Sequence, residues 1–257
     1  MSNIHSTAII EDGAQIGSGV EIGPYAVVGS EVVLGEGCKV FGHAMISGRT
    51  RLGAGCEVHP FAHIGGKTQD LKFEGGITSV EIGARTVMRE YVTVNCGTKD
   101  GESTIIGEDC LLMAYAHVAH GCVFGHHVIV SNATQIAGEV KIGDYATISG
   151  LCGIHQLCRI GCHCMVGVGS AIVQDVAPYM IVSETPAAIR GVNLIGLSRR
   201  GFSEEVRTAL KSAYKLICRS GLNVSDALAE IEATLPALPE IVHLVEFFRT
   251  TQRGVIK

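Results

Sequence analysis

The sequence has no tryptophan, and aromatic residues make up only 5% of its 257 positions. A core built around large rings is therefore excluded. The sequence has 33 glycines and only 6 prolines. Glycines suited to tight turns are therefore common, and prolines that would interrupt a helix or strand are few. The 20 Lys and Arg are outnumbered by 25 Asp and Glu, and a net charge of -5 argues against general nucleic-acid binding.

The sequence also lacks the signals of a membrane or exported protein. No apolar run approaches the roughly 20 residues that span a bilayer. The first residues, MSNIH, are not a basic region followed by an apolar stretch, so no export signal is expected. With 47% hydrophobic and 18% charged residues, the chain is predicted to be globular and cytoplasmic rather than disordered.

What the sequence does contain is a six-residue repeat. Every sixth residue from 10 to 64 is aliphatic, and the hydrophobic frame returns at Ile82 and continues, except at Asp100, to Ile172. Two positions earlier lies a second column of mostly small residues, and residues two apart face the same side of a strand. Three such hexads close one triangular coil of 18 residues, which predicts a solenoid of short parallel strands with coils about 4.8 Å apart.

The repeat also explains the ten cysteines. Cysteines at this number suggest disulfides or zinc, and Cys158, Cys162, His163 and Cys164 look like a metal cluster. Seven of them, however, fall in the small inward column, where cysteine acts as a compact apolar residue. We therefore favour reduced, packed thiols, which suit a reducing cytosol. The seven are Cys38, Cys56, Cys110, Cys122, Cys152, Cys158 and Cys164.

Two interruptions of the repeat, near 65–79 and 95–103, are polar and are predicted to form loops at one edge of the solenoid. The hexads stop after Asp175. We expect a β-helix over residues 1–190 and a small helical domain over 191–257.

The helical domain carries its own start and stop signals. Ser203 is a predicted N-cap followed by two glutamates, and Gly221 is expected to close that helix. A second cap at Ser225 and a start at Pro239 predict two further helices, the last ending near Gly254.

The 18-residue period brings polar side chains together at one corner. His120, Gly138 and Gln156 are 18 residues apart and should stack, flanked by His117, Glu139 and His155. A histidine, with a usual pKa of about 6.5, suits a general base, and a glycine lets a ligand approach a backbone N–H that could hold an oxyanion. This pairing suits acyl transfer from a thioester to a hydroxyl or amine. Solvated corner histidines with no chemistry remain the alternative from the period alone.

Several segments resemble the acyl-carrier-protein–UDP-N-acetylglucosamine O-acyltransferase family, and the resemblance extends over nearly the whole chain. They are Gln69–Lys72 (QDLK), Ala116–His120 (AHVAH), Gly153–Gln156 (GIHQ), Gly191–Asn193 (GVN) and Arg199–Ser203 (RRGFS). The resemblance implies an all-β left-handed parallel β-helix with a small C-terminal α-helical domain, assembled as a homotrimer with sites between neighbouring β-helices. It implies transfer of a (3R)-hydroxyacyl group from acyl carrier protein to the 3-hydroxyl of UDP-N-acetylglucosamine, the first step of lipid A synthesis. No metal or bound cofactor is implied, since phosphopantetheine arrives on the carrier.

The same resemblance implies roles for individual residues. His120 would be the general base, the N–H of Gly138 would stabilise the oxyanion, and Asp70 and Lys72 would bind the sugar nucleotide or its product. Further implied substrate contacts are Gln69, His117, Glu139, His155 and Gln156. The nucleotide and phosphate end is implied for Asn193, Arg199 and Arg200, and a guanidinium fits phosphate as a planar fork.

Three positions depart from the family pattern. Glu139 replaces a common histidine, Ile195 replaces an acidic residue, and Gly121 replaces an Asp or Asn that often follows the catalytic histidine. Val168 falls where the resemblance places the end of the acyl-chain pocket. Because glycine there would leave more room, we expect a preference below the family's longest chains.

A basic ridge recurs every four residues on the first long predicted helix. It consists of Arg207, Lys211, Lys215 and Arg219. Because a carrier protein is strongly acidic, the ridge is a predicted docking surface, with a solvated helix face as the alternative.

Three rival functions remain open. One is another hexapeptide acyltransferase that acts on a 3-amino or other nucleotide-sugar acceptor. The second is a γ-type carbonic anhydrase, which binds zinc between subunits, and the third is a β-helix that binds without catalysis.

Overall fold

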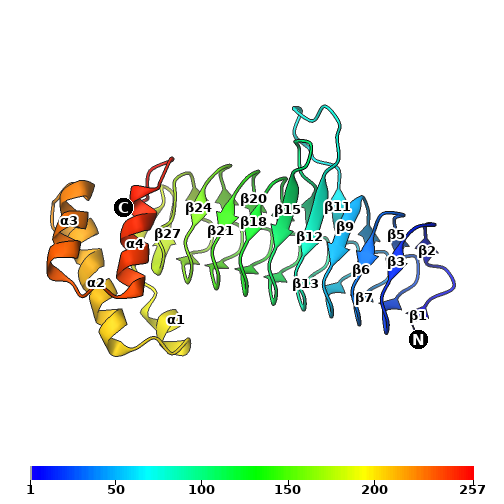
Figure 1. Ribbon diagram of the computed structural model, residues 1–257, viewed down its shortest axis with the longest axis horizontal. Helices are drawn as coiled ribbons and strands as arrows, with labels where there is room; N and C mark the ends of the chain where they lie inside the picture. The colour runs from blue at the N-terminus through cyan, green and yellow to red at the C-terminus, as the bar shows by residue number, and fades with distance from the viewer. Residues whose placement is uncertain (1) are drawn as a thin grey trace.

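The computed structural model describes residues 2–257, which form a long β-helix ending in a group of four helices (Figure 1). The strands make three sheets along the three sides of the β-helix. The helices are α1 (Leu194–Arg199), α2 (Glu204–Arg219), α3 (Val224–Thr234) and α4 (Pro239–Arg249).

Within each sheet the strands lie side by side in chain order. The first contains β1 (Asn3–Ile4), β4 (Glu21–Ile22), β7 (Lys39–Val40), β10 (Glu57–Val58), β13 (Val87–Met88), β16 (Leu111–Leu112), β19 (Ile129–Val130), β22 (Thr147–Ile148), β25 (Met165–Val166), β27 (Met180–Ser183) and β28 (Ala188–Val192). The second contains β2 (Ile9–Ile10), β5 (Val27–Val28), β8 (Met45–Ile46), β11 (His63–Gly66), β14 (Thr93–Asn95), β17 (His117–Val118), β20 (Gln135–Ile136), β23 (Gly153–Ile154) and β26 (Ala171–Ile172). The third contains β3 (Gln15–Ile16), β6 (Val33–Leu34), β9 (Arg49–Leu52), β12 (Ser79–Ile82), β15 (Ser103–Ile106), β18 (Val123–Phe124), β21 (Lys141–Ile142) and β24 (Arg159–Ile160).

The strand register follows the sequence period. Asn3 pairs with Glu21, and each strand up to β23 lies beside the third strand after it, so one turn of the coil passes through all three sheets. The paired strands run parallel except β27 and β28, which form an antiparallel pair at the end of the solenoid. The predicted left-handed parallel β-helix is confirmed.

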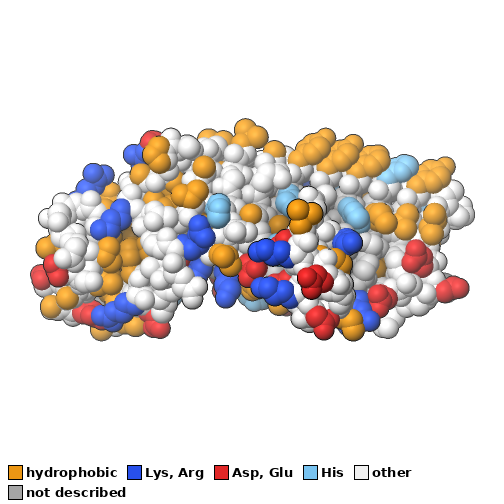
Figure 2. All heavy atoms as spheres, turned by 90° about the horizontal axis from the view of Figure 1, so that it is seen from above, with side chains coloured by type: hydrophobic (Ala, Val, Ile, Leu, Met, Phe, Trp, Pro, Cys, Tyr) orange, Lys and Arg blue, Asp and Glu red, His pale blue; other side chains and the backbone are white. Residues whose placement is uncertain are grey.

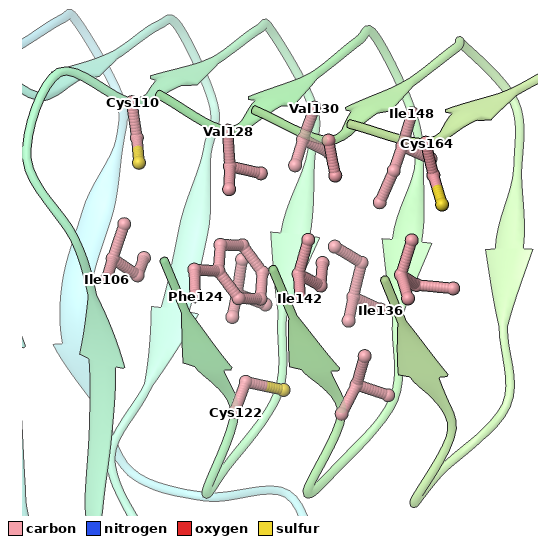
Figure 3. Packing of buried hydrophobic residues seen from close by; sticks show 14 of the residues in the cluster. Ile106, Cys110, Cys122, Phe124, Val128, Val130, Ile136, Ile142, Ile148 and Cys164 are labelled. Carbon is pink, nitrogen blue, oxygen red and sulfur yellow. The ribbon is translucent and has the colours of Figure 1, made fainter. Parts of the chain in front are cut away.

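The two inward columns form one continuous hydrophobic core (Figure 3). Large residues such as Ile136 and Ile148 alternate with small ones such as Val128 along the inside of the coils, and these three are fully buried. The packed-cysteine interpretation is also confirmed, because all seven column cysteines are buried. Burial raises the pKa of the Cys122 thiol to about 12 and that of Cys110 to about 11, so these thiols stay protonated at neutral pH.

Two loops leave the coils on the same side of the β-helix. Residues 67–78 connect β11 to β12 and project from the body (Figure 1), and residues 96–102 connect β14 to β15. Asp100 Oδ1 accepts a hydrogen bond from Ile77 N at 2.7 Å, and the hydroxyls of Thr68 and Thr98 meet at 2.8 Å in a buried position. The two loops therefore brace one another at the coil where the period is broken.

The C-terminal helices differ in detail from the sequence prediction. Ser203 caps α2 as expected, but the cap of α3 is Asn223 and not Ser225, because Asn223 Oδ1 accepts from Asp226 N at 2.9 Å. The last helix ends at Arg249, well before Gly254, because the chain turns back there to the β-helix. The helix α1, with six residues of which one is buried, was not predicted from the sequence.

A buried ion pair joins the helical domain to the last coils. Arg159 Nε lies 2.9 Å from Asp175 Oδ2, and the Asp175 side chain is only 1% exposed. Arg159 also donates to Phe247 O at 2.9 Å, and its guanidinium lies over the Phe247 ring. At the opposite end of the β-helix, both residues of β1 are exposed, and no helix among residues 2–257 covers them. Among residues 2–257, no helix is long and apolar enough to cross a bilayer.

Candidate active site

The predicted corner column exists in the structure. Glu139 N donates to His120 O at 2.9 Å, and Leu157 N donates to Gly138 O at 3.0 Å. These bonds join three successive coils at one corner, so His120 and Gly138 occupy equivalent places one coil apart.

The imidazole of His120 lies directly against Gly138. A Cβ atom at residue 138 would overlap the Nε2 and Cε1 atoms of that ring. Glycine is therefore required for the ring to take this position. The N–H of Gly138 donates to no protein acceptor within residues 2–257, which leaves it available to a bound oxyanion.

Carboxylates approach both nitrogens of the His120 ring. Asp70 Oδ2 lies 3.4 Å from Nε2, and Glu102 Oε2 lies 3.9 Å from Nδ1. The Nδ1 atom is buried and has no hydrogen-bond partner among the described residues. The ring thus has an Nε2 side that faces Gly138 and Asp70 and an Nδ1 side that faces Glu102.

Local hydrogen bonds hold Asp70 in place on the projecting loop. Asp70 Oδ1 accepts from Lys72 N at 2.9 Å, and Asp70 N donates to Thr68 Oγ1 at 3.1 Å. This turn leaves the other carboxylate oxygen directed at His120. The side chains of Gln69 and Lys72 are exposed on the same loop.

Glu102 was missed by the sequence analysis. Its Oε2 atom accepts hydrogen bonds from the backbone N–H groups of Thr98 and, at 3.2 Å, Lys99. Ile105 of β15 pairs with Val123 of β18, so Glu102 belongs to the coil directly before that of His120. The signal was present, because continuing the 18-residue column back by one step from His120 reaches Glu102.

Glu139 completes a small acidic group around the histidine. Ligand atoms of Glu102, His120 and Glu139 lie within 4.8 Å of one another, and within the described part of the chain no other three His, Cys, Asp or Glu side chains meet in this way. Glu139 Oε1 also lies 3.4 Å from Lys99 Nζ, which offsets part of the negative charge. One histidine and two carboxylates are a poor match for zinc, which favours nitrogen and sulfur ligands.

The other predicted histidines differ in their surroundings. His117 Nδ1 is hydrogen-bonded to Thr93 Oγ1 at 2.7 Å, and burial holds the pKa of His117 below its usual value, so that ring is neutral at pH 7. His155 and Gln156 are both exposed, and His155 Nδ1 approaches Gln156 O at 3.2 Å. These exposed side chains are free to contact a ligand.

The residues assigned to the nucleotide end lie beside the last coils, apart from His120. Asn193 caps α1, and its Nδ2 donates to His163 O at 2.9 Å, so its side chain has a structural task. The Arg200 guanidinium lies 4.0 Å from the ring centre of Tyr145, and Arg199 is exposed in the last turn of α1. The structure does not bring these three residues to the His120 corner within one chain.

The remaining predicted residues are also on the surface. Val168 is 70% exposed at a turn between β25 and β26, on a different corner column from His120. The basic ridge lies along α2 and consists of Arg207, Lys211, Lys215 and Arg219. None of these four side chains forms an ion pair with an acidic residue among residues 2–257.

Comparisons with known proteins agree with one another. A family model described as UDP N-acetylglucosamine O-acyltransferase, domain 2, matches residues 175–256. The acyl-[acyl-carrier-protein]–UDP-N-acetylglucosamine O-acyltransferase of Pseudomonas entomophila is 44% identical, and that of Thiobacillus denitrificans is 43% identical, each over 100% of both chains. A UDP-N-acetylglucosamine acyltransferase structure from Bacteroides fragilis is 44% identical with a TM-score of 0.97, covering 99% of this chain and 100% of that one. A structure from Acinetobacter baumannii is 40% identical with a TM-score of 0.95, covering 99% of each chain.

Proposed function

Since this chain belongs to the family of acyl-[acyl-carrier-protein]–UDP-N-acetylglucosamine O-acyltransferases, we propose that His120 and Gly138 form the catalytic pair of that reaction. The chain is an acyltransferase. Its proposed reaction moves a (3R)-hydroxyacyl group from acyl carrier protein to the 3-hydroxyl of UDP-N-acetylglucosamine, the first step of lipid A synthesis. The observation that carries the proposal is the His120 ring lying on Gly138, with Nε2 toward Asp70.

The geometry supports a simple sequence of proton transfers. Nε2 of His120 takes the proton of the sugar 3-hydroxyl as its oxygen attacks the thioester carbon. The Gly138 N–H stabilises the oxyanion of the tetrahedral intermediate. The carbon–sulfur bond then breaks, and the proton held on Nε2 passes to the phosphopantetheine thiolate. No metal or resident cofactor takes part in this proposal.

In this proposal the substrate is held by residues of the first loop and by residues at the corners of the coils. Asp70 and Lys72 hold the sugar, and Gln69, His117, Glu139, His155 and Gln156 line the remainder of the site. Arg199 and Arg200 offer two guanidinium groups for the diphosphate. Because these two arginines are distant from His120 in one chain, the proposal places them in the site of a neighbouring subunit or at its outer end.

A homotrimer accounts for an exposed aromatic stripe on the β-helix. Five side chains stack in sequence along one edge, with ring centres about 5 Å apart: Tyr25, His43, Phe61, Tyr91 and Tyr115. Figure 2 shows this stripe along one edge of the molecule. Tyr25 and Tyr115 are 58% and 57% exposed, so a second copy of the chain would bury a substantial apolar surface there. The proposed location of the trimer is the cytoplasm.

The basic ridge on α2 is the proposed docking surface for the acidic carrier protein. Lys211, Lys215 and Arg219 are exposed, whereas the Arg207 side chain is half-buried and donates to Ser203 O at 3.3 Å. Cations without acidic neighbours are free to pair with a partner and raise its association rate.

Product analysis tests the proposed reaction. Purified protein is incubated with a (3R)-hydroxyacyl carrier and either UDP-N-acetylglucosamine or its 3-amino analogue, and the products are identified by mass spectrometry. We expect the O-acylated sugar nucleotide, and acylation of the 3-amino analogue alone would identify an N-acyltransferase. No product with either acceptor, together with stoichiometric zinc in the purified protein, would support a γ-type carbonic anhydrase.

Chain-length selection is tested at Val168, which we propose limits the acyl pocket. Turnover is compared across carriers of increasing acyl length for the wild type and Val168→Gly. The optimum should move to longer chains in the variant, because removing the side chain leaves more room. An unchanged optimum would reject this role for Val168.

A further inference from the structure

We propose that Glu102 is a positioning residue for His120, and that it occupies the space left by the missing side chain of Gly121. In the substrate complex its carboxylate would accept a hydrogen bond from Nδ1–H, so that Nε2 stays unprotonated and faces the acceptor hydroxyl. This inference rests on the proposed function, because it assigns a partner to the general base.

Gly121 and Glu102 fit together at the corner. A Cβ atom at residue 121 would lie 2.7 Å from Glu102 Oε1 and 3.0 Å from its Cδ, so any side chain there would displace the carboxylate. Glu102 is thus packed into a position that exists only because residue 121 is glycine. The side chain of Glu102 is 18% exposed and that of His120 is 13% exposed, so the pair is largely shielded from solvent.

The backbone of the second loop fixes the carboxylate. The N–H groups of Thr98 and Lys99 both donate to Glu102 Oε2, the same oxygen that lies 3.9 Å from His120 Nδ1. That separation exceeds a hydrogen bond, and such contacts commonly shorten when substrate binds. Nδ1 is buried and has no hydrogen-bond partner among the described residues. Because an unsatisfied buried donor is costly, a hydrogen bond from Nδ1–H to Glu102 would stabilise this arrangement.

The other charged groups near the ring do not fill this role. Asp70 faces Nε2, the nitrogen that must stay free for the substrate. Glu139 lies in the same group of atoms, but its Oε1 approaches Lys99 Nζ at 3.4 Å, on the exposed side. Glu102 is therefore the carboxylate placed to select the tautomer with hydrogen on Nδ1.

The first test is the pH dependence of kcat/KM for Glu102→Gln. Gln keeps an oxygen for the loop N–H groups but loses the negative charge beside the imidazole. We expect kcat to fall about 10- to 100-fold with KM for UDP-N-acetylglucosamine changed less than about threefold. The ascending limb of the kcat/KM profile should move to lower pH, because the variant lacks the negative charge beside the imidazole. The other charged groups near the ring are the same in the wild type and the variant, so they do not account for a difference between the two profiles. They are Asp70, Glu139 and Lys99.

A matched control separates charge at the ring from support of the loop. Asp100→Asn removes a carboxylate two residues away in the same loop, where it accepts from Ile77 N. We expect this control to keep the wild-type pH profile, and thermal melting should show whether either variant loosens the fold. Equal profiles for Glu102→Gln and the wild type would overturn the proposal.

A second test moves the carboxylate to the neighbouring coil. Gly121 has φ +64°, a conformation that Asp tolerates better than most residues. Glu102→Gly and Gly121→Asp should each lower kcat, the first by removing the acid and the second by overlap with Glu102. The kcat of the double variant should be at least tenfold higher than that of the less active single variant, because the carboxylate introduced at position 121 would occupy the space that the Glu102 carboxylate left. Strictly additive losses would contradict the shared-space argument.

These tests distinguish failure of the inference from failure of the proposed function. If the wild type lacks O-acyltransferase activity, or if His120→Ala retains it fully, the proposed function fails first. If the wild type is active and depends on His120 while Glu102→Gln is unchanged, only the role of Glu102 fails.

Discussion

The regular coils and the interrupted coils of this β-helix do different work. From β15 to β23 each strand pairs with the third strand after it, and the residues that point inward belong to one buried hydrophobic cluster. Between β9 and β15 the chain twice leaves the coil, and the two loops carry Asp70 and Glu102 to the corner where His120 lies. Packing energy is thus spread along the repeat, whereas the charged groups around the candidate base come from the places where the repeat is broken.

Replacing the corner histidine should have the largest effect on this contrast. We expect His120→Ala to lower kcat by about a thousandfold, because it removes the proposed general base. Its melting temperature should stay close to that of the wild type, since the side chain lies outside the hydrophobic core. Steady-state assays with the acyl carrier measure the loss, and full activity in the variant would place the chemistry elsewhere.

A core substitution far from the loops should do the opposite. Ile148→Ala in β22 removes a fully buried side chain and should cost about 2–5 kcal/mol of unfolding free energy. The kcat measured well below the melting transition should remain close to wild type. Chemical denaturation with both activity and circular dichroism separates the two effects, and a large loss of kcat in folded protein would contradict the division of roles.

The glycine beneath the histidine joins packing to chemistry. Gly138→Ala introduces a Cβ that overlaps the His120 ring, so the ring must move and kcat should fall about a hundredfold. Gly29→Ala is the matched control, because a Cβ there comes no closer than 3.4 Å to any neighbour. Equal activity of the two variants would show that the ring position is unimportant.

The basic ridge extends the comparison to the helical domain. We expect this domain to bind the carrier protein and to take no part in the chemical step. Lys211→Glu with Lys215→Glu should raise KM for the acyl carrier about tenfold while kcat changes little. Because the contact is electrostatic, added salt should raise the wild-type KM and narrow the difference. An unchanged KM at low salt would leave the ridge as an ordinary solvated helix face.

The smallest effect is expected at the tip of the first loop. Leu71 is fully exposed beside Asp70, and Leu71→Ala should change the unfolding free energy by less than about 0.5 kcal/mol. Compared with Ile148→Ala, this result would show how little the loop contributes to stability. A loss above 2 kcal/mol would mean that the loop packs against another surface, as it would in a trimer.

The repeat in the sequence was enough to predict the coils, the inward cysteines and the stacking of His120 on Gly138. It could not place Asp70, because a loop of irregular length interrupts the register and only the family resemblance singled that residue out. The 18-residue period could have identified Glu102, because it lies one step before His120. It was not predicted, because it falls in the second interruption of the repeat. The short α1 was missed because six residues with one buried side chain leave no helical pattern.

The two ends of the stack are finished differently, and this gives the molecule a direction in which to come apart. The last coil is locked to α4 through Arg159 and Asp175, whereas the first strand offers an uncovered edge. Since each coil rests only on its neighbours, fraying should begin at the amino-terminal tip and travel inward coil by coil. The corner at His120, several coils from that tip, would then be among the later parts to melt, and hydrogen exchange would record the gradient.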